Sequence, residues 1–223
     1  MSFESLGLSA ELLRAVSEQG YTEPTPIQRK AIPLVLQGLD IMAGAQTGTG
    51  KTAGFTLPML QQLSARSVER RPRAVRVLVL APTRELAAQV AESVETYGRH
   101  LPHRAAVIFG GVNINPQISR LRSGIEVLIA TPGRLLDHFE RGKLLLTGVQ
   151  IMVVDEADRM LDMGFIPDIE RIFNLTPFTR QTLFFSATMA PEIERITNTF
   201  LSNPARIEVA RQATASATIE QRL

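Results

Sequence analysis

The chain has 223 residues, of which 44% are hydrophobic and 21% charged, and its net charge is +2. These proportions are those of an ordinary globular domain and argue against long disordered stretches. The sequence contains no cysteine, which excludes disulfides, thiolate metal sites and cysteine nucleophiles. No run of about 18 apolar residues occurs and the N-terminus lacks the pattern of a signal peptide, so we expect a cytoplasmic protein without a membrane partner.

Two helices are predicted before the first strand, and we assign them to a helical region at residues 1–38. Ser9 is a candidate N-cap for the first helix, which Gly20 stops. The second helix begins after Thr25, whose hydroxyl is a good N-cap and is followed by Pro. Gln28, three residues after Thr25, is placed to close a capping box.

From residue 39 onward, short apolar strands alternate with helical stretches. The predicted strands are residues 40–45, 75–80, 105–109, 126–130, 150–154 and 181–185, and the predicted helices are 51–63, 84–98, 115–122, 133–140 and 190–201. This alternation predicts an α/β fold with a mostly parallel sheet and helices on both faces. Ligands in such folds bind at the edge formed by the carboxyl ends of the strands. Residues 64–73 are predicted to form an exposed loop, and the folded unit is expected to end near residue 210.

The segment Ala45–Thr52 (AQTGTGKT) follows a predicted strand and leads into a predicted helix. Gly48 and Gly50 allow the backbone to bend so that successive N–H groups point inward, as in a phosphate-binding P-loop. The helix that begins near Lys51 adds its positive N-terminal dipole. Lys51 is then placed for the β- and γ-phosphates of a nucleotide and the Thr52 hydroxyl for Mg²⁺. The pattern usually opens with Gly, where this chain has Ala, and the alternative is a glycine-rich turn with an incidental lysine.

A second apolar strand ends in acidic residues at Asp155, Glu156 and Asp158. A carboxylate at a strand tip beside the P-loop can hold the metal ion, and we assign Asp155 to this role, acting through water. Glu156 is assigned to orient and deprotonate the attacking water, and Asp158 to link neighbouring motifs. The alternative is that these acids only favour the N-terminus of a following helix, which leaves the acid at the strand tip unexplained.

Residues Asp155–Asp158 spell DEAD, and further segments accompany them in order. Together they resemble the DEAD-box ATP-dependent RNA helicases, specifically the N-terminal one of their two RecA-like halves. The matching segments are the Q motif at 20–28 with Phe3 upstream, motif I at 45–52, motif Ia at 82–86, the GG segment at 110–111, motif Ib at 131–134 and motif III at 186–188. The strings MSFESLGLS, DRMLDMGF and FGGVNINPQ look most like the bacterial RhlE-type subfamily. The resemblance implies a RecA-like ATP-binding domain at residues 39–210 and a linker at residues 211–223.

The resemblance also implies a nucleotide site larger than the P-loop. Gln28 would read the adenine, because an amide pairs with its N6/N7 edge, and Tyr21 would stack on it. The alternative is that Gln28 only closes the capping box, and the two roles are compatible. The implied cofactors are ATP and Mg²⁺, with Lys51, Asp155 and Glu156 as catalytic residues and Thr52 and Asp155 as metal ligands. The nucleotide-binding residues would be Tyr21, Gln28, Gln46, Thr47, Gly48, Thr49, Gly50, Lys51 and Thr52.

A further implication is a groove for RNA that grips the phosphate backbone without reading bases. Its residues would be Pro82, Thr83, Arg84, Gly110, Gly111, Thr131, Pro132, Gly133 and Arg134. By pattern alone, Thr83 and Thr131 are ordinary helix starts, and only the resemblance favours an RNA role. Ser186 and Thr188 would couple the state of ATP to that of RNA by hydrogen bonds to the DEAD acids, and the alternative is a Ser/Thr cap.

The second RecA-like half of the family, with its arginine fingers and HRxGR-type motif, has no counterpart in these 223 residues. An arginine finger contributes about 10³–10⁵ in rate, so we expect the chain alone to bind adenine nucleotide, hardly hydrolyse it and not unwind RNA. Three alternatives stay open: a GTPase or small-molecule kinase, an ATP-switched RNA clamp without turnover, and a DNA substrate. The chain lacks an Asn-Lys-x-Asp guanine signature, which argues against a GTPase, and the choice of RNA over DNA rests on the resemblance.

Overall fold

The structure, a computed structural model, describes residues 1–66 and 74–209. Its strands pair in a single sheet of order β3-β4-β2-β5-β6-β1-β7, and every pairing is parallel. The strand bounds are β1 (Ile41–Gly44), β2 (Val77–Leu80), β3 (Ala105–Ile108), β4 (Val127–Ala130), β5 (Ile151–Val154), β6 (Gln181–Ser186) and β7 (Ala205–Glu208). The predicted α/β class with a parallel sheet is therefore confirmed.

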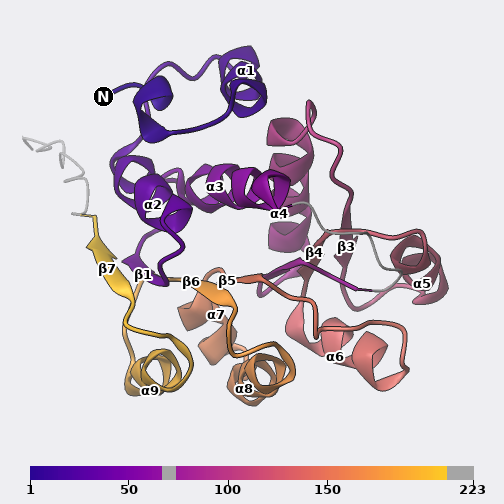
Figure 1. Cartoon of the computed structure of the whole chain (residues 1–223). Helices are drawn as coiled ribbons and strands as arrows, with labels where there is room; N and C mark the ends of the chain where they lie inside the picture. The colour runs from indigo at the N-terminus through magenta and orange to yellow at the C-terminus, as the bar shows by residue number, and fades with distance from the viewer. Residues whose placement is uncertain (67–73, 210–223) are drawn as a thin grey trace, which may run out of the picture.

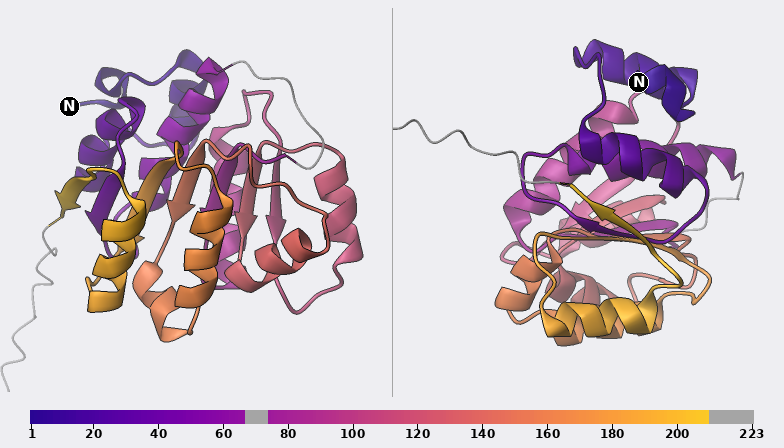
Figure 2. Two further views of the ribbon diagram at one scale, coloured as in Figure 1. Left: turned by 60° about the horizontal axis from the view of Figure 1, so that its bottom comes forward. Right: turned by 90° about the vertical axis from the view of Figure 1, so that its left-hand side faces the viewer.

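Helices cover both faces of this sheet (Figure 1). On one face lie α2 (Pro26–Leu36), α3 (Lys51–Ala65) and α4 (Arg84–Tyr97), with α1 (Ala10–Glu18) and a short 3₁₀ helix (Phe3–Leu6) outside them. The other face carries α6 (Pro132–Glu140), α7 (Ala157–Asp162), α8 (Ile166–Leu175) and α9 (Pro191–Phe200), while α5 (Asn115–Arg122) lies beside β3. The right-hand view of Figure 2 shows the sheet between these two helix layers. No helix in the described part of the chain is both long and apolar enough to cross a membrane.

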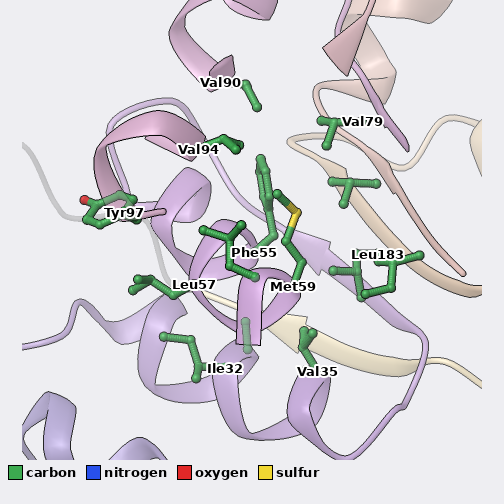
Figure 3. Packing of buried hydrophobic residues seen from close by; sticks show 14 of the residues in the cluster. Ile32, Val35, Phe55, Leu57, Met59, Val79, Val90, Val94, Tyr97 and Leu183 are labelled. Atoms are coloured by element: carbon green, nitrogen blue, oxygen red, sulfur yellow. The ribbon is translucent and has the colours of Figure 1, made fainter. Parts of the chain in front are cut away.

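Alternate residues of each strand serve two separate cores. On β2, Val77 and Val79 belong to the cluster under α2, α3 and α4, whereas Leu78 and Leu80 belong to the cluster on the opposite face. Figure 3 shows the first cluster, in which Phe55 of α3 packs near the sheet and its ring centroid lies 5.3 Å from that of Phe185. Because both faces are covered, the strands read as continuous apolar runs, which made them recognisable in the sequence.

Every predicted strand occurs, and the observed ends differ from the predicted ends by at most two residues. The prediction missed β7, α7 and α8. In β7 only Ile207 is buried, as expected for an edge strand, so the local signal is weak. In α8 the buried residues Ile166, Ile169, Ile172 and Phe173 have helical spacing, a signal that was present in the sequence.

The two predicted helix starts near the N-terminus differ in outcome. Thr25 forms the capping box with Gln28 in both directions, as predicted. Ser9 occupies the N-cap of α1, but its side chain makes no capping bond, and its backbone N–H donates instead to Gln61 Oε1 at 2.6 Å. The predicted loop at residues 64–73 is corrected at its start, because α3 runs to Ala65; residues 67–73 and the predicted linker at 211–223 lie outside the described part.

Candidate nucleotide and RNA site

The phosphate loop and the acidic strand tip lie at the same edge of the sheet. The loop follows β1 and the acids follow β5, and β6 is the one strand between β1 and β5. Since all the strands are parallel, their carboxyl ends point to one edge. Residues more than 100 positions apart in the sequence are thereby brought together.

Lys51 connects the two segments directly. Its Nζ lies 2.9 Å from Asp155 Oδ1 and 3.3 Å from Glu156 Oε1, and the three side chains are only 7%, 5% and 11% exposed. Thr47 of the loop also donates a hydrogen bond to Glu156 Oε1 at 3.4 Å. The predicted convergence of the glycine-rich bend with the acidic tip is therefore confirmed.

Burial governs the charges of this cluster. Removal from water raises the pKa of Asp155 above its ordinary value, and the Lys51 ammonium opposes that effect. Glu156 has a backbone φ of 55°, in the left-handed region that a residue with a side chain seldom adopts. Such a conformation costs about 1–3 kcal/mol and concentrates at functional sites, which supports a special role for this carboxylate.

The Q-motif helix is fastened to the phosphate loop through Gln28. Its Oε1 accepts from the Thr25 backbone N–H at 3.0 Å, and its Nε2 donates to the Gly50 carbonyl oxygen at 3.0 Å. A Cβ at Gly50 would lie 2.7 Å from Gln28 Nε2, so glycine is required there for close approach as well as for its φ of 82°. The sequence predicted the capping box, but no local pattern indicates a contact across 22 residues. Tyr21 lies nearby in sequence and is 57% exposed.

The segments assigned to RNA follow β2, β3 and β4 at the same edge of the sheet. Thr83 caps α4 by accepting from the Leu86 N–H at 3.3 Å, so its interpretation as a helix start holds. Thr131 occupies the N-cap of α6 but makes no capping bond with its side chain. Arg84 is exposed, and its guanidinium lies 5.8 Å from the centre of the Phe109 ring. Pro82 is buried and Pro132 begins α6, so both shape the backbone.

Two assigned residues make contacts that the sequence did not predict. The Ser186 hydroxyl donates to the Thr188 carbonyl oxygen at 2.6 Å, so its proton is not directed at the DEAD acids in this structure. Arg134 donates to the Val112 carbonyl oxygen at 3.0 Å and to Gln117 Oε1 at 3.1 Å, and its side chain is only 12% exposed. The contacts of Arg134 span 17 and 22 residues, which explains why local patterns did not reveal them, whereas the Ser186 bond lies within one turn of the chain.

The DEAD/DEAH box helicase family profile matches residues 25–196. The chain is 47% identical over 220 residues to the DEAD-box ATP-dependent RNA helicase CshA of Bacillus cereus, covering 99% of this chain and 41% of that protein. It is 43% identical over 221 residues to the DEAD-box ATP-dependent RNA helicase RhpA of Helicobacter pylori, covering 99% of this chain and 44% of the relative. The chain thus spans less than half the length of these curated relatives.

Solved structures agree with these matches. A crystal structure of a DEAD box protein from Methanococcus jannaschii superimposes with a TM-score of 0.87 at 39% identity, covering 94% of this chain and 56% of that chain. A hypothetical ATP-dependent RNA helicase from Sulfolobus tokodaii superimposes with a TM-score of 0.83 at 37% identity, covering 91% and 57%. Because the family profile spans both the phosphate loop and the acids that meet it, the chain belongs to the DEAD/DEAH box helicase family, as an N-terminal RecA-like domain.

Proposed function

We propose that this chain is the ATP-binding half of an ATP-dependent RNA helicase. The observation that carries the proposal is the buried contact of Lys51 with Asp155 and Glu156 beside the phosphate loop. The relatives at 43–47% identity are named ATP-dependent RNA helicases. In this reading, residues 1–38 form the Q-motif region, 39–210 the ATP-binding domain and 211–223 the linker.

ATP would bind with its phosphates in the loop of Gln46, Thr47, Gly48, Thr49, Gly50, Lys51 and Thr52. Lys51, which contacts two carboxyl groups in this structure, would turn its charge to the β- and γ-phosphates. Asp155 and Glu156, which contact Lys51 in this structure, would then lie beside the bound phosphates. Gln28 keeps one N–H and one lone pair beyond its bonds to Thr25 and Gly50, and these would contact the adenine, with Tyr21 stacking on it.

Mg²⁺ is expected to accompany the nucleotide, with Thr52 and Asp155 as its protein partners. The oxygen donors suit this ion, and the Lys51 ammonium 2.9 Å away favours the ionised form of the Asp155 carboxyl at the strand tip. When bound, the ion would neutralise phosphate charge. Glu156, held in its left-handed backbone conformation and hydrogen-bonded by Thr47, would orient the attacking water and accept its proton.

RNA would bind by its backbone along the edge that carries Pro82, Thr83, Arg84, Gly110, Gly111, Thr131, Pro132 and Gly133, with Arg134 in the same segment. Asp158, Ser186 and Thr188 would couple the two sites, because β6 ends between the phosphate loop and the acids. Hydrolysis and unwinding would need a second RecA-like half of the same protein. The RhlE-type subfamily is the finer assignment that the sequence strings favour, and the cytoplasm is the compartment that we propose.

The proposal is tested by the affinity of this chain for ADP, measured by calorimetry. Lys51→Met removes a charged hydrogen bond to phosphate and should weaken binding by at least about tenfold. Lys30→Met is the matched control, since Lys30 is an exposed lysine that bonds the Glu208 carbonyl oxygen, and it should leave the affinity unchanged. Thermal unfolding of each variant reports whether it is folded.

Two outcomes would contradict the proposal. If the folded Lys51→Met variant bound ADP as tightly as the wild type, the nucleotide would not bind at this loop. Tighter binding of GDP than of ADP would support the GTPase alternative instead.

A further inference from the structure

The turn that carries Gly110 and Gly111 is fastened at both ends by side chains of other elements. Gln117 of α5 donates through Nε2 to the Phe109 carbonyl oxygen at 3.0 Å, just before the two glycines. Arg134 of α6 donates through Nη2 to the Val112 carbonyl oxygen at 3.0 Å, just after them. The residues between these two carbonyls are exposed to solvent.

Gln117 also contacts Arg134, the side chain that holds the other end of the turn, and His138. Its Oε1 accepts from Arg134 Nη1 at 3.1 Å and lies 3.0 Å from His138 Nε2. The orientation of the amide follows from chemistry, because Arg134 can only donate and a carbonyl oxygen can only accept. His138 therefore donates through Nε2 as a neutral imidazole, and burial together with the Arg134 charge lowers its pKa to about 4.

The contacts of Arg134 leave it little capacity for a phosphate. Nη1 and Nη2 each donate one hydrogen bond within the protein, and Nε lies 3.8 Å from Asp137 Oδ2. Because the side chain is only 12% exposed, little of the guanidinium is accessible for a bidentate contact with an RNA phosphate. The Arg84 side chain, by contrast, is 53% exposed, and its Nε lies 3.7 Å from Oε1 of the exposed Glu85.

We propose that Gln117, Arg134 and His138 form a clasp that positions the Gly110–Gly111 turn against the start of α6. This inference rests on the proposed RNA function. The clasp fixes the distance between the Gly110–Gly111 turn and the start of α6, the two segments that are expected to bind phosphates. Because this distance is already set in the free protein, little conformational entropy is lost when the two segments bind successive phosphates. Its members are positioning residues and do not contact RNA themselves.

The test measures binding of a fluorescent ten-nucleotide oligouridylate to this chain by anisotropy, at low salt. Gln117→Met and Arg134→Met each remove clasp hydrogen bonds and should weaken binding by roughly three- to tenfold. The double variant should lose little more than one single variant, since both break the same clasp. Arg84→Met should act independently, so that the fold-loss of RNA affinity in the Arg84→Met/Gln117→Met double variant is the product of the two single fold-losses. ADP affinity, measured alongside, should not change in the clasp variants.

Backbone NMR order parameters give a second measurement that does not depend on RNA. Those of Gly110, Gly111 and Val112 should fall in Gln117→Met, while those of the phosphate loop should keep their wild-type values. Unchanged order parameters in this segment would overturn the clasp even if the RNA affinity fell.

The outcomes separate the clasp from the function on which it rests. Wild-type RNA affinity in Gln117→Met together with a loss in Arg134→Met would overturn the clasp and make Arg134 a direct phosphate ligand. Failure of the wild-type chain to bind oligouridylate, with ADP binding intact, would overturn the proposed RNA role and the clasp with it.

Discussion

At the scale of single residues, Gly50 has two separate reasons to be glycine. Its φ of 82° lies in the left-handed region, and a Cβ there would approach Gln28 Nε2 to 2.7 Å and Thr25 Oγ1 to 2.9 Å. Gly48 shares only the first reason, because it has a φ of 83° and nothing within 4 Å of the added Cβ. The two glycines of the phosphate loop therefore form a natural pair of test sites.

Gly48→Ala should lower the free energy of unfolding by about 1–2 kcal/mol through backbone strain alone. Gly50→Ala should cost about 1–2 kcal/mol more, because Gln28 must move away and lose bonds to Gly50 and Thr25. Urea denaturation of both variants checks this expectation. Equal losses would show that the contact of Gln28 with the loop contributes nothing to stability.

At the scale of elements, α1 and α2 begin with similar residues but are held differently. Thr25 and Gln28 satisfy each other's backbone N–H groups at the start of α2. Ser9 makes no such bond, and the start of α1 is held by Gln61 of α3. The start of α2 is therefore fixed locally, whereas the start of α1 depends on packing against another helix.

Thr25→Val should destabilise the chain by about 1 kcal/mol, because it keeps the shape of the side chain and removes the capping oxygen. Ser9→Ala should change the free energy of unfolding by less than about 0.5 kcal/mol. Both are measured by denaturant unfolding under the same conditions. A loss at Ser9 as large as that at Thr25 would mean that the Ser9 hydroxyl caps α1 in solution.

At the scale of the whole molecule, one sheet edge carries both proposed sites. The nucleotide segments follow β1 and β5, and the RNA segments follow β2, β3 and β4. The strand order places β2 between β5 and β4, so the two sites are adjacent parts of one rigid sheet. In the proposed helicase, the relative motion that drives RNA strands apart would then come from a second RecA-like half that closes on this edge.

This chain alone should bind ADP and release phosphate from ATP at a background rate, with or without RNA. The proposed second half would supply arginine fingers worth about 10³–10⁵ in rate. Phosphate release is measured for the 223-residue chain and for the proposed protein with both halves, where Glu156→Gln should abolish turnover and keep nucleotide binding. Robust RNA-stimulated turnover by this chain would contradict the need for a second half.

The sequence by itself determined the local chemistry. Lys51 follows a glycine-bearing bend at a helix start, and Asp155 ends an apolar strand, and each pattern is contained within about ten neighbouring residues. The covered strands were predictable for the same reason, since continuous apolar runs are a local signal. The edge strand β7 escaped because it buries only Ile207.

Tertiary structure alone decided which of these local features meet. The strand order put Lys51 Nζ 2.9 Å from Asp155, and it brought the Gln28 amide to Gly50 and the Arg134 guanidinium to Val112. A periodic pattern reports how a segment is buried and not which distant segment covers it, so side-chain contacts across separate loops became visible only in the folded chain.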